Sequence, residues 1–219
     1  ESCASGGARF DPGMLYYAPQ CWTSDDTDAV ERLKIQYGTS MVYPVSSMGA
    51  HVSACPNHQL GRTTPLATRA AVALFGTFGY ELDLNRLSAE ECAQITRQVA
   101  FAKQWRQVVQ FGTFWRLQSP FAGNEAAWMT VSPDRNTALV GVYRVLQEVN
   151  AGFRRVRLVG LDPDRLYRVT APDGTARCHY GDELMQAGLV TSDGSCGENP
   201  TGEGDFLARL YRLEAVRPE

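Results

Sequence analysis

The sequence predicts an α/β part followed by an all-β part. Over residues 1–112, short apolar runs alternate with helix-like stretches, and polar loops follow the first two of these runs. Over residues 113–219, short β-like runs are separated by turn-forming residues. No low-complexity linker divides the two parts. We therefore expect a parallel sheet covered by helices over 1–112 and an antiparallel β-sandwich over 113–219.

The strands expected in the first part are short. They are Cys21–Ser24, Met48–Ser53 and Phe78–Leu82. A cluster of aspartates follows the first strand, and the polar loop Cys55–Gln59 follows the second. Because loops after the carboxyl ends of parallel strands carry the chemistry of barrel enzymes, these two loops are the first places to look for a functional site.

A helix is expected directly after the aspartate cluster. Val30, Leu33 and Tyr37 recur at the spacing of one helical face. Gly38 is a fitting C-terminal stop, since glycine commonly ends helices. A second helix is expected over Thr68–Leu74.

The clearest helix signal lies near the end of the first part. Ser88 and Glu91 have the S-x-x-E spacing of a capping box, in which each side chain bonds to the other residue's backbone amide. The apolar residues that follow predict a long helix that continues to Val109.

The second part reads as a series of antiparallel strands. Turn-forming dipeptides such as Pro133-Asp134 and Asp173-Gly174 separate runs rich in β-branched and aromatic residues. The expected strands are Ala127–Val131, Ala138–Tyr143, Arg155–Val159 and Phe206–Leu213. None of these runs carries an evident catalytic motif.

Composition narrows the class of protein. The net charge is −3, so the chain has no basic footprint for nucleic acid. No apolar run approaches the ~20 residues that span a bilayer, so no membrane partner is expected. The cysteine spacings match no zinc pattern, and free thiols in a reducing cytoplasm are expected at Cys3, Cys21, Cys55, Cys92, Cys178 and Cys196. Because the chain starts with Glu inside a dense motif, we expect a piece of a longer protein.

Three hypotheses compete for the cluster Asp25-Asp26-Thr27-Asp28. Aspartate is favoured at a helix N-terminus by hydrogen bonding and by the helix dipole, so capping is the structural explanation. A calcium loop is disfavoured, because no turn glycine and no further oxygen ligands follow. The third is catalysis by a carboxyl group. His51 and His58 lack a third ligand for a metal, and we expect them to orient loops instead.

Motifs that include this cluster run along nearly the whole chain. They are Glu1–Asp11, Tyr16–Ala29, Ile35–Ser40, Ser47–Ser53, Pro56–Gln59, Phe78–Asp83, Asn124–Trp128, Gly160–Pro163 and Gly181–Met185. Together they resemble the α-galactosidases of glycoside hydrolase family 36. The resemblance implies that residues 1–112 are the C-terminal half of a (β/α)₈ barrel and that residues 113–219 are the C-terminal antiparallel β-sandwich.

The resemblance also implies an activity and a set of site residues. The activity is retaining hydrolysis of terminal α-linked galactose from oligosaccharides such as raffinose or melibiose, without a cofactor. Asp25 corresponds to the catalytic acid/base. Cys3, Gly6 and Trp22 correspond to substrate contacts, with Cys3 near the sugar's 2-hydroxyl. Members of this family often form homo-oligomers, so one is expected of the full-length parent.

One departure from the family pattern has a consequence for activity. The family's nucleophile lies in a Lys-Trp-Asp motif, which this sequence does not contain. We therefore expect this chain to be inactive by itself. The alternatives are a carbohydrate-binding or structural module without catalysis, and a relative with α-N-acetylgalactosaminidase or galactosyl-transfer activity. Cys3 near the 2-position disfavours a substrate with a bulky acetamido group.

Overall fold

The chain is built from two compact units, residues 1–110 and residues 111–219. The structure is a computed structural model, and it describes residues 2–3, 11–149, 152–193 and 204–217. In this part of the chain, no helix is both long enough and apolar enough to cross a membrane.

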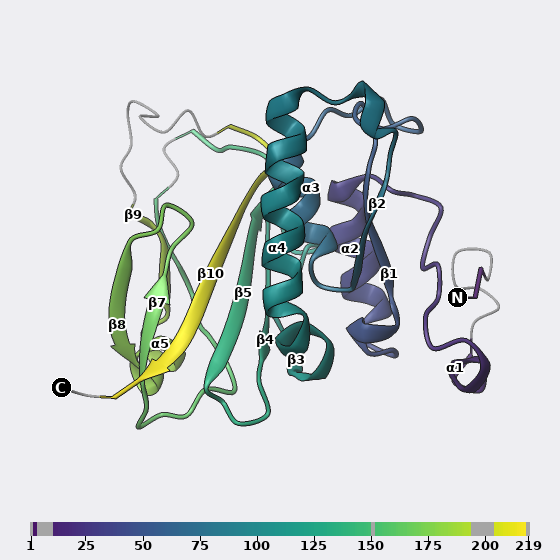
Figure 1. Cartoon of the computed structure of the whole chain (residues 1–219). Coiled ribbons are helices and arrows are strands. Elements are labelled where there is room, and N and C mark those ends of the chain that lie inside the picture. Colours follow the sequence, from purple (N-terminus) through teal and green to yellow (C-terminus); the bar gives the residue numbers. More distant parts are fainter. Residues whose placement is uncertain (1, 4–10, 150–151, 194–203, 218–219) are drawn as a thin grey trace. The chain divides into compact units, whose positions relative to one another are not determined.

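The first unit contains helices and a parallel strand pair (Figure 1). Its elements in chain order are α1 (Met14–Tyr17), α2 (Ala29–Thr39), the 3₁₀ turn η1 (Val45–Ser47), β1 (Gly49–Ser53), α3 (Leu66–Ala73), β2 (Thr77–Glu81), the 3₁₀ turn η2 (Leu84–Arg86) and α4 (Ala89–Phe111). The predicted strands at Met48–Ser53 and Phe78–Leu82 therefore lie within one residue of β1 and β2.

Strand β1 has two faces with different neighbours. Ala50 and Val52 are fully buried and form a core with Leu66, Ala70 and Ala73 of α3. Because side chains alternate between the faces of a strand, Gly49, His51 and Ser53 belong to the opposite face. β2 pairs with β1 in parallel, so that His51 lies opposite Gly79 in the register.

Two helix starts follow the predicted capping chemistry. Asp28 is the N-cap of α2, and its side chain accepts hydrogen bonds from the amides of Val30 and Glu31. Ahead of α4, Ser88 N donates to Glu91 Oε2 at 2.8 Å, and Glu91 N donates to Ser88 Oγ at 3.2 Å. These reciprocal bonds confirm the predicted capping box.

The predicted stop at Gly38 is wrong. Helix α2 continues to Thr39, and its C-cap is Ser40 in a right-handed helical conformation. The Ser40 hydroxyl donates to the carbonyl oxygen of Tyr37 at 2.7 Å. A polar side chain thus occupies a helix-end carbonyl, so the left-handed glycine turn is not used.

The predicted strand Cys21–Ser24 is also wrong beyond its first residue. Cys21 forms single parallel bridges with Ser2 and with Met48. The next rung of a parallel ladder would use the carbonyl oxygen of Gly49. That oxygen accepts instead from the hydroxyl of Thr23 at 3.1 Å and from Arg32 Nη2 at 2.5 Å. Side chains therefore end the ladder after one residue.

The second unit is built on antiparallel sheets. Its main sheet has the strand order β3-β4-β5-β10-β7-β8, and β10 lies between β5 and β7 (Figure 1). A separate antiparallel pair joins β6 to β9. The elements are β3 (Thr113–Gln118), β4 (Glu125–Val131), β5 (Thr137–Arg144), β6 (Phe153–Val156), β7 (Leu166–Thr170), β8 (Ala176–Tyr180), α5 (Gly181–Gln186), β9 (Leu189–Asp193) and β10 (Leu207–Val216).

One apolar core joins these elements. Buried side chains from β4, β5, β7 and β10 pack with Val156 of β6, Leu184 of α5 and Leu189 of β9. The main sheet is therefore covered on one face by β6, β9 and α5, an arrangement of antiparallel sheets that is consistent with the predicted sandwich. The Tyr167 hydroxyl also donates to Arg135 O at 2.8 Å and accepts from Asp162 N at 3.1 Å.

Candidate active site

The candidate site lies where parallel segments of the first unit end. The carbonyl oxygen of Ser2 accepts a hydrogen bond from Trp22 N at 2.8 Å, and that of Cys21 accepts one from Gly49 N at 2.8 Å. With β2 beside β1, four parallel segments lie in the order Ser2, Cys21, β1, β2. Residues just beyond their carboxyl ends are therefore brought together along one edge, as at the functional edge of α/β sheets.

Cys3 and Trp22 both lie at this edge. Each is the residue directly after a bridged one, since Ser2 pairs with Cys21 and Cys21 pairs with Met48. Cys3 is exposed, and Trp22 is half-buried. The predicted contact residue Gly6 lies outside the described residues.

Asp25 is exposed and is held by Trp22. The indole Nε1 of Trp22 donates a hydrogen bond to Asp25 Oδ1 at 3.0 Å. The same indole ring packs against the imidazole of His51, with ring centroids 4.8 Å apart and planes tilted by 35°. The carboxyl that the sequence singled out therefore has a specific aromatic partner, which motif spacing could not have revealed.

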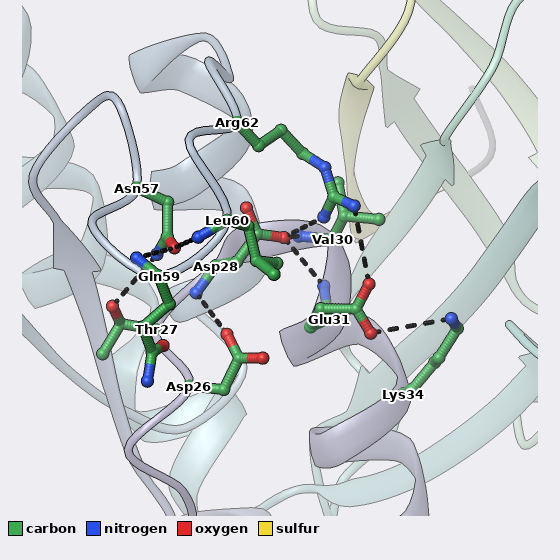
Figure 2. A network of polar contacts seen from close by, with 10 residues as sticks. All are labelled: Asp26, Thr27, Asp28, Val30, Glu31, Lys34, Asn57, Gln59, Leu60 and Arg62. Atoms are coloured by element: carbon green, nitrogen blue, oxygen red, sulfur yellow. Dashed lines mark hydrogen bonds and ion pairs between the residues drawn. The ribbon is translucent and has the colours of Figure 1, made fainter.

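Asp28 has a different environment from Asp25. It is 2 % exposed, and its Oδ1 accepts from Val30 N at 3.0 Å and from Glu31 N at 3.1 Å. Arg62 Nη1 forms an ion pair with the same carboxylate, and its Nη2 lies 3.6 Å from Glu31 Oε1 (Figure 2). Asp28 therefore acts as a helix cap and as an anchor for the loop that carries Arg62.

The loop after β1 is tied to the aspartate cluster at a second point. Asn57 accepts hydrogen bonds from Gln59 N and Leu60 N, both at 2.9 Å, which fix the turn of this loop. Its amide nitrogen is 3.4 Å from Thr27 Oγ1, to which it donates (Figure 2). Two loops from neighbouring segments are thus joined beside Asp25.

Arg32 of α2 is a buried side chain that holds Thr23, just before the aspartate cluster, and Gly49 of β1. It is 6 % exposed, and Nη2 donates to Thr23 Oγ1 at 2.9 Å as well as to the carbonyl of Gly49. Burial lowers the pKa of Arg32 to about 10, and the nearby Asp26 carboxylate opposes that shift. The guanidinium thus stays protonated at neutral pH and links helix α2 to β1.

Arg69 links α3 to the carboxyl end of β1 in a similar way. It is 8 % exposed and donates to the carbonyl oxygens of Ser53 at 2.5 Å and Thr64 at 3.3 Å. Burial also lowers the pKa of Arg69. Sequence reasoning missed both arginines. The available signal was a charged residue on an apolar helical face, since Arg32 lies one turn from Ala29 and next to Leu33.

Among the described residues, no group of three or more His, Cys, Asp and Glu side chains could hold a metal ion. Cys3, Cys21, Cys55, Cys92 and Cys178 form no disulfide among the described residues, and Cys196 lies outside them. The chemistry that this edge can offer from described side chains is therefore that of a carboxyl group, a thiol and hydrogen-bond donors.

Comparison with known families matches the two units separately. Residues 1–112 match the melibiase family, and residues 125–213 match the glycosyl hydrolase family 36 C-terminal domain. A carboxyl at the ends of parallel segments, in a unit of the melibiase family, defines the class as a glycosyl hydrolase. The chain belongs to glycosyl hydrolase family 36.

Named relatives agree with this assignment. The chain is 56 % identical over 217 residues to α-galactosidase AgaA of Geobacillus stearothermophilus. The aligned region covers 99 % of this chain and 28 % of AgaA. It is 47 % identical over 216 residues to α-galactosidase Mel36A of Lactobacillus acidophilus. This alignment covers 99 % of this chain and 28 % of Mel36A. The chain thus spans between a quarter and a third of the length of these relatives.

Solved structures give the same result. A crystal structure of an AgaA variant in complex with raffinose matches with a TM-score of 0.89 at 55 % identity, over 98 % of this chain and 28 % of that one. The α-galactosidase from Lactobacillus brevis matches with a TM-score of 0.91 at 49 % identity, over 100 % of this chain and 29 % of that one.

Proposed function

We propose that this chain is the C-terminal part of a retaining α-galactosidase that removes terminal α-linked galactose from oligosaccharides such as raffinose and melibiose. The observation that carries the proposal is the Trp22–Asp25 hydrogen bond at the carboxyl ends of parallel segments, in a unit of the melibiase family. Relatives named α-galactosidases support the substrate class, as do neighbouring structures in complex with raffinose and with stachyose.

The first unit would then be half of a (β/α)₈ barrel. The parallel order of Ser2, Cys21, β1 and β2, with α2 before β1 and α3 before β2, supports this. A cavity of about 280 Å³ lies between β2 and α4, lined by apolar side chains that include Phe78, Tyr80 and Val99. We infer that strands of a preceding segment close the barrel beside β2, because a barrel leaves no open sheet edge.

The proposed chemistry uses two carboxyl groups ~5–5.5 Å apart. Asp25 donates its proton to the glycosidic oxygen as the bond from that oxygen to the anomeric carbon breaks. The second carboxylate attacks the anomeric carbon from the other side and forms a covalent glycosyl-enzyme. In the second step, Asp25 takes a proton from the water that attacks the same carbon, and the second carboxylate leaves.

Cys3 and Gly6 complete the proposed sugar site on this chain. Cys3, one residue after the Ser2 bridge, would contact the galactose near its 2-hydroxyl. A thiol there leaves little room for an acetamido group, so a galactoside is preferred to a 2-acetamido galactoside. We propose that the second carboxylate comes from a segment outside this chain, since the sequence has no Lys-Trp-Asp motif. The chain alone is then inactive.

The test compares the isolated chain with the full-length protein that carries it. The full-length protein is expected to hydrolyse an aryl α-galactoside, to release galactose with retained α-configuration, and to act far more slowly on the matching 2-acetamido substrate. NMR of the first-formed product reports the configuration. Turnover by the isolated chain would contradict the two-carboxyl proposal. A preference for the 2-acetamido substrate would contradict the proposed role of Cys3.

A further inference from the structure

His51 has no role in the proposed reaction so far, yet it contacts both Trp22 and Gly79. It lies at the centre of β1, on the strand face opposite the apolar core with α3. Its imidazole packs against the indole of Trp22, with centroids 4.8 Å apart. The indole in turn donates to Asp25. A continuous line of contacts therefore runs from the parallel strand pair to the candidate acid.

Gly79 forms the other side of this arrangement. It is the register partner of His51 on β2. A Cβ atom placed on Gly79 would lie 2.7 Å from His51 Cδ2 and 3.1 Å from His51 Nε2. Contacts below 3.0 Å essentially never occur for real Cβ atoms, so any larger residue at position 79 must move the imidazole. The missing side chain of Gly79 thus provides the space that the His51 ring occupies.

The Trp22 hydrogen bond distinguishes the two oxygens of Asp25. An indole N–H is a donor only, so the oxygen that it contacts must act as an acceptor in both protonation states of the carboxyl. That oxygen is Oδ1. Because the carbonyl-type oxygen of a protonated carboxyl is the better acceptor, this hydrogen bond favours the form in which the transferable proton is on Oδ2. The orientation of the indole therefore favours one of the two oxygens as the proton donor.

We propose that His51 is a positioning residue for proton transfer, which holds the Trp22 indole so that Asp25 carries its proton on Oδ2, and that Gly79 is required because it makes room for His51. This inference rests on the proposed α-galactosidase function and deepens it. His51 acts through its packing against Trp22. Its contribution is geometric, and misplacement of a reacting group by about 1 Å can cost roughly 100-fold in rate.

A comparison of two leaving groups separates this role from a merely structural one. When raffinose is cleaved, the leaving group departs through a strongly basic sugar oxygen and needs a proton donor. When a dinitrophenyl α-galactoside is cleaved, the leaving group is a stable phenolate, which needs little help from an acid. Both share the galactosyl group. Damage to sugar binding or to folding therefore lowers kcat/KM for both, while a misplaced proton donor affects raffinose alone.

The experiment uses the full-length protein that carries this chain. His51→Ala and Gly79→Ala are each expected to lower kcat/KM for raffinose roughly 10- to 100-fold, and to change that for the dinitrophenyl substrate less than about threefold. His51→Phe keeps a flat ring against Trp22 and is expected to recover most of the raffinose rate. Gly38→Ala is the matched control, because a Cβ there meets nothing within 4 Å.

The outcomes distinguish failure of the positioning role of His51 from failure of the proposed α-galactosidase function. Equal losses on both substrates, or no loss on either, would overturn the positioning role while leaving the proposed function intact. A loss for His51→Phe as large as that for His51→Ala would contradict the role of ring packing. If the unaltered full-length protein hydrolysed neither substrate, the proposed function would fail and the inference would fail with it.

Discussion

At the residue scale, the three aspartates of one short cluster have different environments. Asp25 is exposed and bonded to an indole, whereas Asp28 is buried, caps a helix and pairs with Arg62. Asp26 accepts a hydrogen bond from Asp28 N at 3.0 Å and so shapes the turn between them. Residue spacing alone left capping and catalysis as competing hypotheses for the cluster, and the family resemblance singled out Asp25 for catalysis. In the structure, capping falls to Asp28, and Asp25 remains available for chemistry.

The Asp28–Arg62 pair predicts a coupled loss of stability. Asp28→Asn keeps the acceptor for the Val30 and Glu31 amides but removes the charge that Arg62 needs. Arg62→Met leaves a buried carboxylate without its ion pair. Each change is expected to lower the local free energy of opening of α2 by about 1–3 kcal/mol, because hydrogen bonds to charged groups are worth that much. Hydrogen exchange at the Val30 and Glu31 amides measures it.

The double variant and a surface pair provide the controls for this prediction. Asp28→Asn with Arg62→Met is expected to cost less than the sum of the two single changes, since both remove the same interaction. Lys34→Met removes an exposed pair, 3.6 Å from Glu31, and is expected to change the opening free energy by less than about 0.5 kcal/mol. Strict additivity of the two buried changes would show that the pair does not act as a unit.

At the element scale, the capping box predicts a pH dependence. Hydrogen bonds from Ser88 N and Oγ to Glu91 lower the pKa of that carboxyl from its ordinary 4.5. A lowered pKa means that the box stabilises the folded helix fully above pH 4.5. This stabilisation is lost as pH falls through the folded-state pKa. Hydrogen exchange of residues 88–95, corrected for its intrinsic pH dependence, is expected to show the first turn of α4 opening more readily there.

Glu91→Gln is the matched variant for this prediction. A neutral amide oxygen can still accept from Ser88 N but does not titrate in this range. The variant should therefore lose the pH-dependent part of the protection and keep a smaller, constant part. The same acid-induced loss in wild type and in Glu91→Gln would assign the effect to another group.

Elements were predictable where a local signal exists. The capping box at Ser88 and Glu91 and the apolar run of β1 are such signals, and both elements form where expected. The predicted strand at Cys21 stops after one residue because its ladder is ended by the side chain of Thr23, inside the predicted strand, and by that of Arg32 in α2. Strand β8 was missed because its side chains are largely exposed, so it carries no apolar pattern.

The candidate site was likewise predictable only where the sequence carries a motif. Asp25 and Trp22 were predicted through motif resemblance, and in the structure they follow the bridged residue Cys21. Their mutual hydrogen bond joins residues only three apart, whereas the contacts of Trp22 with His51 and of His51 with Gly79 depend on how parallel segments pair. Such contacts join residues far apart in sequence, and no local pattern reports them. Arg62 was missed for the same reason, since its partner Asp28 lies in another loop.

At the scale of the whole molecule, the two units differ in the size of their sheets. The main core of the second unit is made of its own strands and α5. In the first unit, β1 and β2 form a sheet of two strands beside an apolar cavity at β2 and α4. An isolated two-stranded sheet is marginal in water, and open apolar edges favour association.

This difference predicts how the two units behave when produced separately. Residues 111–219 alone are expected to remain monomeric and to unfold cooperatively in denaturant, with coincident transitions by fluorescence and circular dichroism. Residues 1–110 alone are expected to associate or aggregate, as light scattering would show. A monomeric, cooperatively folded 1–110 would contradict the view that this unit needs a further segment to close its sheet.

We propose that Asp25 is the proton donor of an α-galactosidase. Its most direct test compares Asp25→Asn with Asp26→Asn in the full-length protein, using raffinose as substrate. Asp25→Asn is expected to lower kcat/KM roughly 100- to 10,000-fold, the usual contribution of a general acid. Asp26→Asn keeps its acceptor for Asp28 N and should stay within several-fold of wild type. A folded Asp25→Asn protein that retained the wild-type rate on raffinose would contradict the account.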